Sequence, residues 1–261
     1  MARSLGEVAR LIGEAGESCV LCIDFDGTLA EIVDDPASAV ALPGIPGLLE
    51  RAASSLGRVA VVSGRPLAFL ETALGKVPDV LLFGLYGAEA RRRDGALANG
   101  SSPVPHSARA RLDGAMAELD AMAPGIELER KDLSVVVHWR QAPERAAELE
   151  ALGRGVGKRH GLEVLAAKMA LELAVPGVGD KGQVVRRLAA GMRTACFVGD
   201  DRGDLAAFAA LGELAGAGLQ AIRVAVQSPE SPAELVAAAD LVVEGPAGTR
   251  ALLQAIVAEL A

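Results

Sequence analysis

Hydrophobic and polar residues follow two patterns along the chain, and the first belongs to its two outer parts. Continuous apolar runs, which predict strands buried on both faces, occur at 18–25, 58–63, 79–85, 194–200, 222–226 and 239–244. Segments with helical spacing lie between them, at 66–74, 180–191 and 203–215. This alternation predicts a doubly wound α/β fold around a parallel sheet.

The second pattern occupies the middle of the chain. Its order is helix, strand, strand, repeated once: 108–122, 125–130, 133–140, then 142–160, 162–167 and 170–175. The repeat predicts a small α+β domain on a sheet of its own. Gly- and Pro-containing stretches, "ANGSSPVPHS" and "VPGVGDKG", border it as expected hinges. We therefore predict a core domain of residues 1–104 and 176–261 and an inserted domain of residues 105–175.

Composition narrows the class of protein. Apolar residues make up 51% of the chain, which suits a packed core and excludes a disordered chain. The formal net charge of −8 argues against nucleic acid as the main partner. Residues 1–18 have the spacing of an amphipathic helix without the apolar region of a signal peptide, and no stretch approaches membrane-spanning length. We expect a cytoplasmic protein that binds neither nucleic acid nor membrane.

The cysteines do not form a disulfide framework. Cys19 and Cys22 are spaced as a C-x-x-C, which could hold a metal or act as a redox pair, and Cys196 stands apart. However, the pair lies on the first apolar run, with no second pair or histidine cluster beside it. We favour plain buried thiols.

Polar residues follow several of the predicted strands. In "DFDGT", Asp24 and Asp26 follow the first apolar run, and Gly27 would supply the positive φ of an Asx turn. That turn alone would explain the motif. Ser63, which ends the next strand before a helix, could hold an anion with the backbone donors around it.

Two later segments complete the set. Lys181 opens a helix just after the insert, and an acidic cluster of Asp200, Asp201 and Asp204 follows another strand. In open α/β sheets, ligands bind beyond the carboxyl ends of the strands. We therefore expect these groups to meet the two aspartates and the serine at one sheet edge.

The chemistry of such a set favours phosphoryl transfer. Clustered carboxylates repel one another, so a hard cation should bridge them, and Mg²⁺ prefers a few carboxylates plus a substrate phosphate. With no candidate serine or cysteine triad, the available nucleophile is a carboxylate, which can form an aspartyl-phosphate. Asp24 and Asp26 share one side of an extended segment, so one can attack phosphorus while the other handles the proton of the leaving group.

The four motifs "DFDGT", "SGR", "DKG" and "GDDRGD" together resemble those of the haloacid dehalogenase (HAD) superfamily of phosphatases. The resemblance implies a HAD-like core with an inserted cap domain. It implies Asp24 as nucleophile and Asp26 as general acid and base. Ser63 and Lys181 would bind the phosphoryl oxygens.

The same resemblance implies a Mg²⁺ site formed by Asp24, the backbone carbonyl of Asp26, and Asp200. Asp201 and Asp204 would support the metal or orient the lysine, although an N-cap role suits either equally well. Beside the serine, Gly64 and Arg65 are candidates for binding substrate.

Within the superfamily, the insert resembles a type IIB cap, and the whole chain is similar to the trehalose-6-phosphate phosphatase family. The cap residues that carry this similarity would hold the sugar hydroxyls and help to hold phosphate: Glu129, Lys131, His138, Arg140 and Glu172. The chain departs from the family pattern at Tyr86, Trp139, Gly203 and Leu205, none of which is a predicted metal ligand or nucleophile.

Simpler interpretations of the cap residues stay open. Glu129 and Lys131 could be a solvated pair on a strand, and His138 could be a core imidazole. The expected activity is Mg²⁺-dependent hydrolysis of trehalose 6-phosphate. The alternatives are a phosphatase for another sugar or glyceryl-sugar phosphate, a phosphomannomutase-like phosphotransferase, and a non-catalytic sensor, which would have no need of a nucleophile. A partner synthase cannot be read from the sequence.

Overall fold

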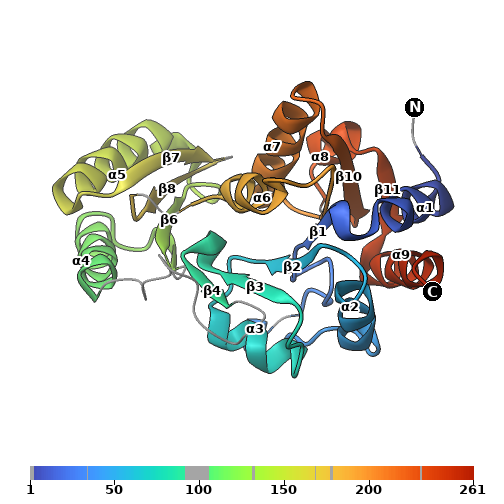
Figure 1. The fold of residues 1–261 in the computed structure, drawn as a ribbon. Helices are drawn as coiled ribbons and strands as arrows, with labels where there is room; N and C mark the ends of the chain where they lie inside the picture. The colour runs from blue at the N-terminus through green and yellow to red at the C-terminus, as the bar shows by residue number, and fades with distance from the viewer. Residues whose placement is uncertain are drawn as a thin grey trace. The chain divides into compact units, whose positions relative to one another are not determined.

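The computed structural model describes residues 3–33, 35–91, 106–130, 133–167, 169–176, 179–229 and 231–261. The chain divides into two compact units, a larger one of Met1–Ser101 with Gly179–Ala261 and a smaller one of Ser102–Val178. Figure 1 shows their helices and strands. Below, the larger is called the core unit and the smaller the cap unit.

The core unit is built around one sheet with the strand order β11-β10-β9-β1-β2-β3-β4. Its strands are β1 (Cys19–Ile23), β2 (Arg58–Val62), β3 (Leu81–Gly84), β4 (Glu89–Arg91), β9 (Thr194–Gly199), β10 (Gln220–Gln227) and β11 (Leu241–Glu244). Neighbouring strands from β11 to β3 pair in parallel, and β4 pairs antiparallel with β3. The predicted doubly wound α/β fold is confirmed, whereas β4 was not predicted because its three residues, Glu-Ala-Arg, contain no apolar run.

Helices cover both faces of this sheet (Figure 1). One face packs against α1 (Leu5–Ala15), α2 (Ile45–Ala53), α3 (Leu67–Leu74) and α9 (Gly245–Glu259). The other packs against α6 (Lys181–Ala189), α7 (Leu205–Gly216) and α8 (Ala233–Ala238). The sequence did not predict α2 and α9, whose first turns contain proline and glycine. Proline is tolerated in a first helical turn because that N–H has no intrahelical partner.

Strand β1 lies between β9 and β2 and brings three polar strand ends side by side. Its residues Leu21 and Cys22 are in register with Val59 and Ala60 of β2. On the other side, Ile23 pairs with Val198 of β9. The residues that follow β1, β2 and β9 therefore meet at one edge of the sheet, as the apolar pattern predicts for parallel strands.

The cap unit has an antiparallel sheet with the order β5-β6-β8-β7. Its elements are α4 (His106–Met122), β5 (Glu127–Arg130), β6 (Ser134–His138), α5 (Ala146–His160), β7 (Glu163–Ala167) and β8 (Ala170–Ala174). The predicted order of helix, strand, strand, repeated once, is therefore confirmed. Val135 and Val137 of β6 and Leu171 and Leu173 of β8 form a core with both helices. Because strand residues alternate between faces, the intervening residues lie on the sheet face away from the helices.

Two further predictions concern the cysteines and the lack of a membrane-spanning segment. Cys19, Cys22 and Cys196 are free and buried, as expected for plain core thiols, and burial raises the pKa of Cys19 to about 12. Such thiols stay protonated and are poor nucleophiles and ligands. Over the part of the chain that the structure describes, the helices are too short or too polar to cross a membrane.

Candidate active site

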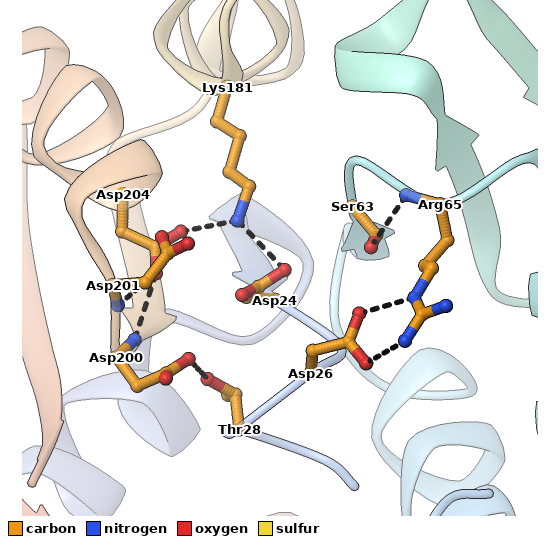
Figure 2. A network of polar contacts seen from close by, with 9 residues as sticks. All are labelled: Asp24, Asp26, Thr28, Ser63, Arg65, Lys181, Asp200, Asp201 and Asp204. Carbon is orange, nitrogen blue, oxygen red and sulfur yellow. Dashed lines mark hydrogen bonds and ion pairs between the residues drawn. The ribbon is translucent and has the colours of Figure 1, made fainter. Parts of the chain in front are cut away.

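An ion triad of Asp24, Lys181 and Asp204 lies at the carboxyl edge of the core sheet (Figure 2). Asp24 directly follows β1, and its N–H donates to Val198 of β9 at 2.9 Å, which extends the sheet by one residue. The Lys181 Nζ lies 2.8 Å from Asp24 Oδ1 and 2.7 Å from Asp204 Oδ1. The three residues are buried, so the charges attract one another in a medium that screens them weakly.

Local structure at the start of α6 aims the lysine at this triad. Asp180 caps the helix, because its carboxylate accepts from the N–H of Gln183 at 2.7 Å. At Gly182, a Cβ would lie 2.4 Å from the backbone oxygen of Ala206, so only glycine lets α6 approach the first turn of α7 this closely. The motif Asp-Lys-Gly therefore contains a cap, a functional cation and a packing site.

Asp204 organises the loop that follows β9. While one of its oxygens binds the lysine, the other accepts from the N–H groups of Asp200 and Asp201 at 2.8 and 3.0 Å. Asp201 is the N-cap residue of a 3-10 turn, η5 (Arg202–Asp204). Of the alternatives that the sequence left open for Asp204, the contacts favour orientation of the lysine, together with a structural role in the turn.

Asp200 faces Asp24 across the loop that follows β1. Its Oδ1 accepts from the buried hydroxyl of Thr28 at 2.9 Å. Gly27 has a φ of 68°, as predicted from its turn, and a Cβ at this position would lie 2.1 Å from Asp200 Oδ2. Glycine is therefore required both by the turn and by the close approach of the second carboxylate.

The carboxylates of this site fit a hard cation. Among the described residues, Asp24, Asp200 and Asp204 each offer an oxygen within 4.8 Å of the others. Burial, and then the neighbouring carboxylates Asp204 and Asp201, raise the pKa of Asp200 to about 7. Burial also raises the pKa of Asp204, to about 6, although Lys181 opposes that shift. Burial and neighbouring carboxylates both disfavour the ionised form of these groups, and a divalent cation would stabilise that form.

Burial and neighbouring charges balance differently in the pKa values of Asp24 and Lys181. Burial raises the pKa of Asp24 well above its usual range; Lys181 opposes this shift, while the nearby carboxylates add to it. For Lys181, burial acts to lower the pKa, but Asp204, Asp24 and Asp201 outweigh it, so the pKa of the ammonium is raised. The neighbouring carboxylates thus favour the charged form of the lysine.

Ser63 follows β2 on the other side of Asp24. The residue is buried, its N–H donates to Phe83 at 2.9 Å, and its Oγ accepts from the N–H of Arg65 at 3.2 Å. A Cβ on Gly64 would lie 2.8 Å from the hydroxyl of Tyr86, so the tyrosine lies directly over this loop. Ser63 is therefore held in place at the end of β2, and its role in binding a phosphoryl group stays a prediction.

Arg65 forms a different contact from the one its motif suggested. Its Nε and Nη2 donate to the two carboxylate oxygens of Asp26, both at 2.8 Å. Figure 2 shows the Asp26 carboxylate turned toward this guanidinium, while Asp24 faces Lys181. The two aspartates of the motif therefore have different charged partners.

In the cap unit, two predicted residues form one contact. His138 of β6 lies with its Nε2 3.0 Å from Glu129 Oε2 of β5. The imidazole is partly exposed, with 28% of its side-chain surface accessible, so it is not a core residue. It belongs to the sheet face away from α4 and α5, because it directly follows Val137, whose side chain packs in the core with the helices, and adjacent strand residues point to opposite faces.

Glu172 of β8 lies on the same face of the cap sheet. Cross-strand pairing places Val136 opposite both Glu129 and Glu172, so the two carboxylates flank it. Glu172 also accepts a hydrogen bond from the hydroxyl of the buried Ser134. Three of the predicted cap residues thus share one sheet face.

The remaining predicted cap residues are placed differently. Arg140 is exposed in the turn after β6, outside the sheet. Lys131 lies outside the described residues. The suggestion of a solvated Glu129–Lys131 pair therefore stays a prediction.

Comparison with known proteins agrees with this geometry. The sequence profile of the trehalose-phosphatase family matches residues 22–239, which include the whole cap unit, most of the core unit and every motif described above. The chain belongs to this family. A trehalose-phosphate phosphatase from Mycobacterium avium is 34% identical over 212 residues, which cover 76% of this chain and 53% of that protein. The chain thus spans about half the length of this family member.

Solved structures of family members share the fold. The trehalose-6-phosphate phosphatase of Aspergillus fumigatus superposes with a TM-score of 0.74 at 24% identity, covering 98% of each chain. The C-terminal domain of the Candida albicans trehalose-6-phosphate phosphatase gives a TM-score of 0.72 at 22% identity, covering 99% of this chain and 98% of that one. The predicted HAD-like core with an α+β cap is confirmed.

The sequence alone did not assign a role to three residues around the site of this trehalose-phosphatase family member. Thr28 orients Asp200, Glu89 accepts from the N–H of Leu67 at 2.8 Å and so caps α3, and Tyr86 covers Gly64. Tyr86 has a φ of 57°, which is unusual for a residue other than glycine. The T after D-x-D-G was a usable signal, whereas the two others depend on contacts between distant segments.

Proposed function

We propose that this protein is a Mg²⁺-dependent phosphatase that hydrolyses trehalose 6-phosphate to trehalose and phosphate. The observation that carries the proposal is the buried triad in which Lys181 holds Asp24, beside a second carboxylate, Asp200, at the edge of the sheet. A pure sensor would gain nothing from a nucleophile held in such a cluster. Membership in the trehalose-phosphatase family supports the choice of sugar.

In the first half of the reaction, Asp24 attacks phosphorus. A bond forms between a carboxylate oxygen of Asp24 and phosphorus, and the bond from phosphorus to the sugar oxygen breaks. Asp26 gives its proton to that oxygen, so the sugar leaves as an alcohol. Lys181 and Ser63 neutralise and hold the phosphoryl oxygens during the transfer.

In the second half, water attacks the aspartyl-phosphate. Asp26, now a carboxylate, takes a proton from the water, inorganic phosphate leaves, and Asp24 is regenerated. One group therefore serves as acid and then as base, which restores its starting protonation state after each turnover.

The metal would be held by Asp24, Asp200 and the backbone carbonyl of Asp26. When bound, Mg²⁺ would neutralise the phosphoryl oxygens and so let an anionic substrate approach anionic residues. Asp204 has a different role, because both of its oxygens already bind the lysine and the loop N–H groups. It keeps the ammonium in place.

The cap unit would select the sugar. Glu129, His138 and Glu172 present acceptors and a donor on one sheet face, which suits the hydroxyl groups of a disaccharide. Arg140 and Lys131 would add positive charge for the phosphate.

A phosphate-release screen over a panel of sugar phosphates, with and without Mg²⁺, tests the proposal. We expect trehalose 6-phosphate to have the highest kcat/KM and the reaction to need the metal. Equal rates with glucose 6-phosphate would indicate a general sugar phosphatase. A requirement for a bisphosphate activator would indicate a phosphotransferase, and a failure to release phosphate from any member would leave a sensor.

A further inference from the structure

The Asp26–Arg65 pair is the contact in the site that the expected role of the arginine does not explain. The guanidinium meets the carboxylate with two parallel bonds, both of 2.8 Å, from Nε to Oδ2 and from Nη2 to Oδ1. A planar fork that binds both oxygens fixes the rotation of the carboxylate as well as its position. The fork uses one lone pair of each oxygen, so the second lone pair of either oxygen can carry the proton that Asp26 transfers. Both side chains are partly accessible, at 35% for Asp26 and 24% for Arg65, so the pair lies at an open side of the site.

The guanidinium of Arg65 is also restrained by an aromatic ring. It stacks on the ring of Phe69 at 4.5 Å, and Phe69 meets the ring of Phe25 edge to face at 5.7 Å. Phe25 is fully buried and lies between the two aspartates of the motif. The arginine is thus packed against a ring that the core keeps in place, and cation–π attraction between the guanidinium and the ring adds to this restraint.

A fixed orientation, which Arg65 provides, suits Asp26 as a group that must transfer a proton. A carboxylate at the accessible end of a loop has several rotamers, and only an orientation toward the leaving oxygen allows proton transfer. Lys181 binds Asp24 and Asp204, whereas the Asp26 side chain pairs with Arg65. The restraint on Asp26 comes from Arg65.

We infer that Arg65 is a positioning residue that orients Asp26 for proton transfer to and from the leaving group, rather than a ligand of the phosphoryl group. The inference rests on the proposed function in that Asp26 is taken as the acid and base. It changes the expectation from the sequence, which placed Arg65 among the substrate-binding residues.

Leaving-group dependence separates the two roles. In a series of aryl phosphates from p-nitrophenyl to phenyl, the leaving group becomes more basic and needs the proton of Asp26 more. The kcat/KM of each ester reports the steps through phosphorylation of Asp24 and is not affected by the later hydrolysis. We expect Arg65→Ala to lose less than about threefold on p-nitrophenyl phosphate and about 10- to 100-fold on phenyl phosphate and trehalose 6-phosphate, since general acid catalysis contributes roughly 10²–10⁴-fold.

A double-mutant cycle with Asp26→Asn tests whether Arg65 acts through Asp26. On phenyl phosphate, Arg65→Ala should cost almost nothing further once Asp26→Asn is present. Binding of inorganic phosphate in the presence of Mg²⁺, measured by calorimetry, should likewise be the same for Asp26→Asn and for the double variant. Arg65→Lys should recover only part of the loss, because an ammonium cannot form the fork.

Arg187→Ala is a matched control, because Arg187 stacks on Phe83 at 4.9 Å in the same unit but does not contact Asp26. It should leave the leaving-group dependence unchanged. Equal losses on all esters, or a phosphate affinity at least about tenfold weaker in the double variant than in Asp26→Asn, would overturn the inference, since a loss of about 1.4 kcal/mol would then belong to the phosphate itself.

The failure of the proposed function is distinguishable from the failure of this inference. If trehalose 6-phosphate is a poor substrate, the aryl series still measures the dependence on the leaving group. If no ester is hydrolysed, the proposed function falls, and the phosphate-binding cycle still decides whether Arg65 contacts phosphate.

Discussion

The charged groups of the core unit and the polar groups of the cap unit differ in how far folding has removed them from water. Asp24 and Lys181 expose 4% and 2% of their surface, and each has a partner of opposite charge within 2.8 Å. On the cap face, the side chain of Glu129 is 49% accessible and that of His138 is 28% accessible. The core site is thus dehydrated before any ligand arrives, whereas the cap face stays hydrated until something covers it.

This difference predicts different tasks for the two units. Preorganised charges in a dry site favour the bond-making step, because they need no reorganisation when the charge develops. Hydrated side chains instead lose water when a ligand binds, so their contribution depends on how well the ligand replaces it. We therefore expect variants of the buried core carboxylates to affect every substrate and variants of the polar cap face to affect only substrates with a sugar.

The largest effect is expected from the nucleophile candidate. Asp24→Asn keeps the size of the side chain but removes the charge and the nucleophile, so kcat should fall by about 10⁴-fold or more on both trehalose 6-phosphate and p-nitrophenyl phosphate. Steady-state kinetics on the purified variant measure this. The matched control is Asp113→Asn, whose exposed carboxylate pairs with Arg130 in the cap unit and should not matter for the small ester. Activity within tenfold of the parent protein, a change of about 1.4 kcal/mol, would exclude Asp24 as nucleophile.

Metal removal should act on both substrates in the same way. Chelation should abolish activity and Mg²⁺ restore it, whereas Ca²⁺ should inhibit because its larger and looser coordination would place Asp24 poorly for attack. Binding is followed separately by the melting temperature, which Mg²⁺ should raise in the parent protein and hardly at all in Asp200→Asn. Full turnover in metal-free buffer would contradict the metal assignment.

Cap variants should separate the substrates. Glu172→Ala and Glu129→Ala should each lose at least about tenfold in kcat/KM on trehalose 6-phosphate, because a lost hydrogen bond to a desolvated hydroxyl costs roughly 1–3 kcal/mol. On p-nitrophenyl phosphate the expected loss is less than about threefold, since that ester has no sugar to contact. Assaying both substrates with one enzyme preparation corrects for any fraction that is misfolded.

Glu150→Ala is the control for these cap variants. Glu150 is exposed on α5, where it pairs with Arg154 at 2.7 Å, in the helical layer rather than on the polar sheet face. Glu150→Ala should leave kcat/KM unchanged for both substrates. If the two cap variants lose equally on the sugar and on the small ester, the assignment of different tasks to the two units is wrong.

The last expected effect is on stability and leaves turnover aside. Without metal, the pKa of Asp200 is raised, mainly by burial, to about 7, whereas in the unfolded chain it returns to about 3.9. The folded state therefore binds this proton more tightly, so the free energy of unfolding is highest below about pH 4 for this group and falls as the pH rises through about 7. In EDTA, the melting temperature should fall over that interval by about 2–4 °C for each kcal/mol lost.

Magnesium should weaken this pH dependence, because the cation replaces the proton as the partner of the carboxylate. Asp200→Asn should weaken it as well, and without metal, because its amide does not titrate. A metal-free parent protein whose melting temperature rises between about pH 4 and pH 7 more steeply than that of Asp200→Asn would have the opposite sign and contradict the interpretation.

The sequence by itself determined the parts of this protein that depend on neighbours along the chain. Continuous apolar runs fixed the parallel strands, as at β1 and β9, because burial on both faces demands it. Gly27 was predicted from turn chemistry and has the positive φ expected. Because the carboxyl ends of parallel strands share an edge, even the meeting of Asp24, Ser63 and Asp200 could be expected from the predicted parallel sheet.

Only the tertiary structure decided which charged groups became partners. Arg65 and Asp26 are 39 residues apart, and Lys181 and Asp204 are 23 apart, so no local periodicity links either pair. Whether Asp204 bound a metal or the lysine depended on the approach of α6 to α7, which Gly182 permits. The strand order brings β1, β2 and β9 together, but the side chain that each loop turns inward depends on packing between distant segments. Local sequence patterns do not encode that choice, because a buried polar side chain pairs with whichever group the folded chain places within hydrogen-bond distance.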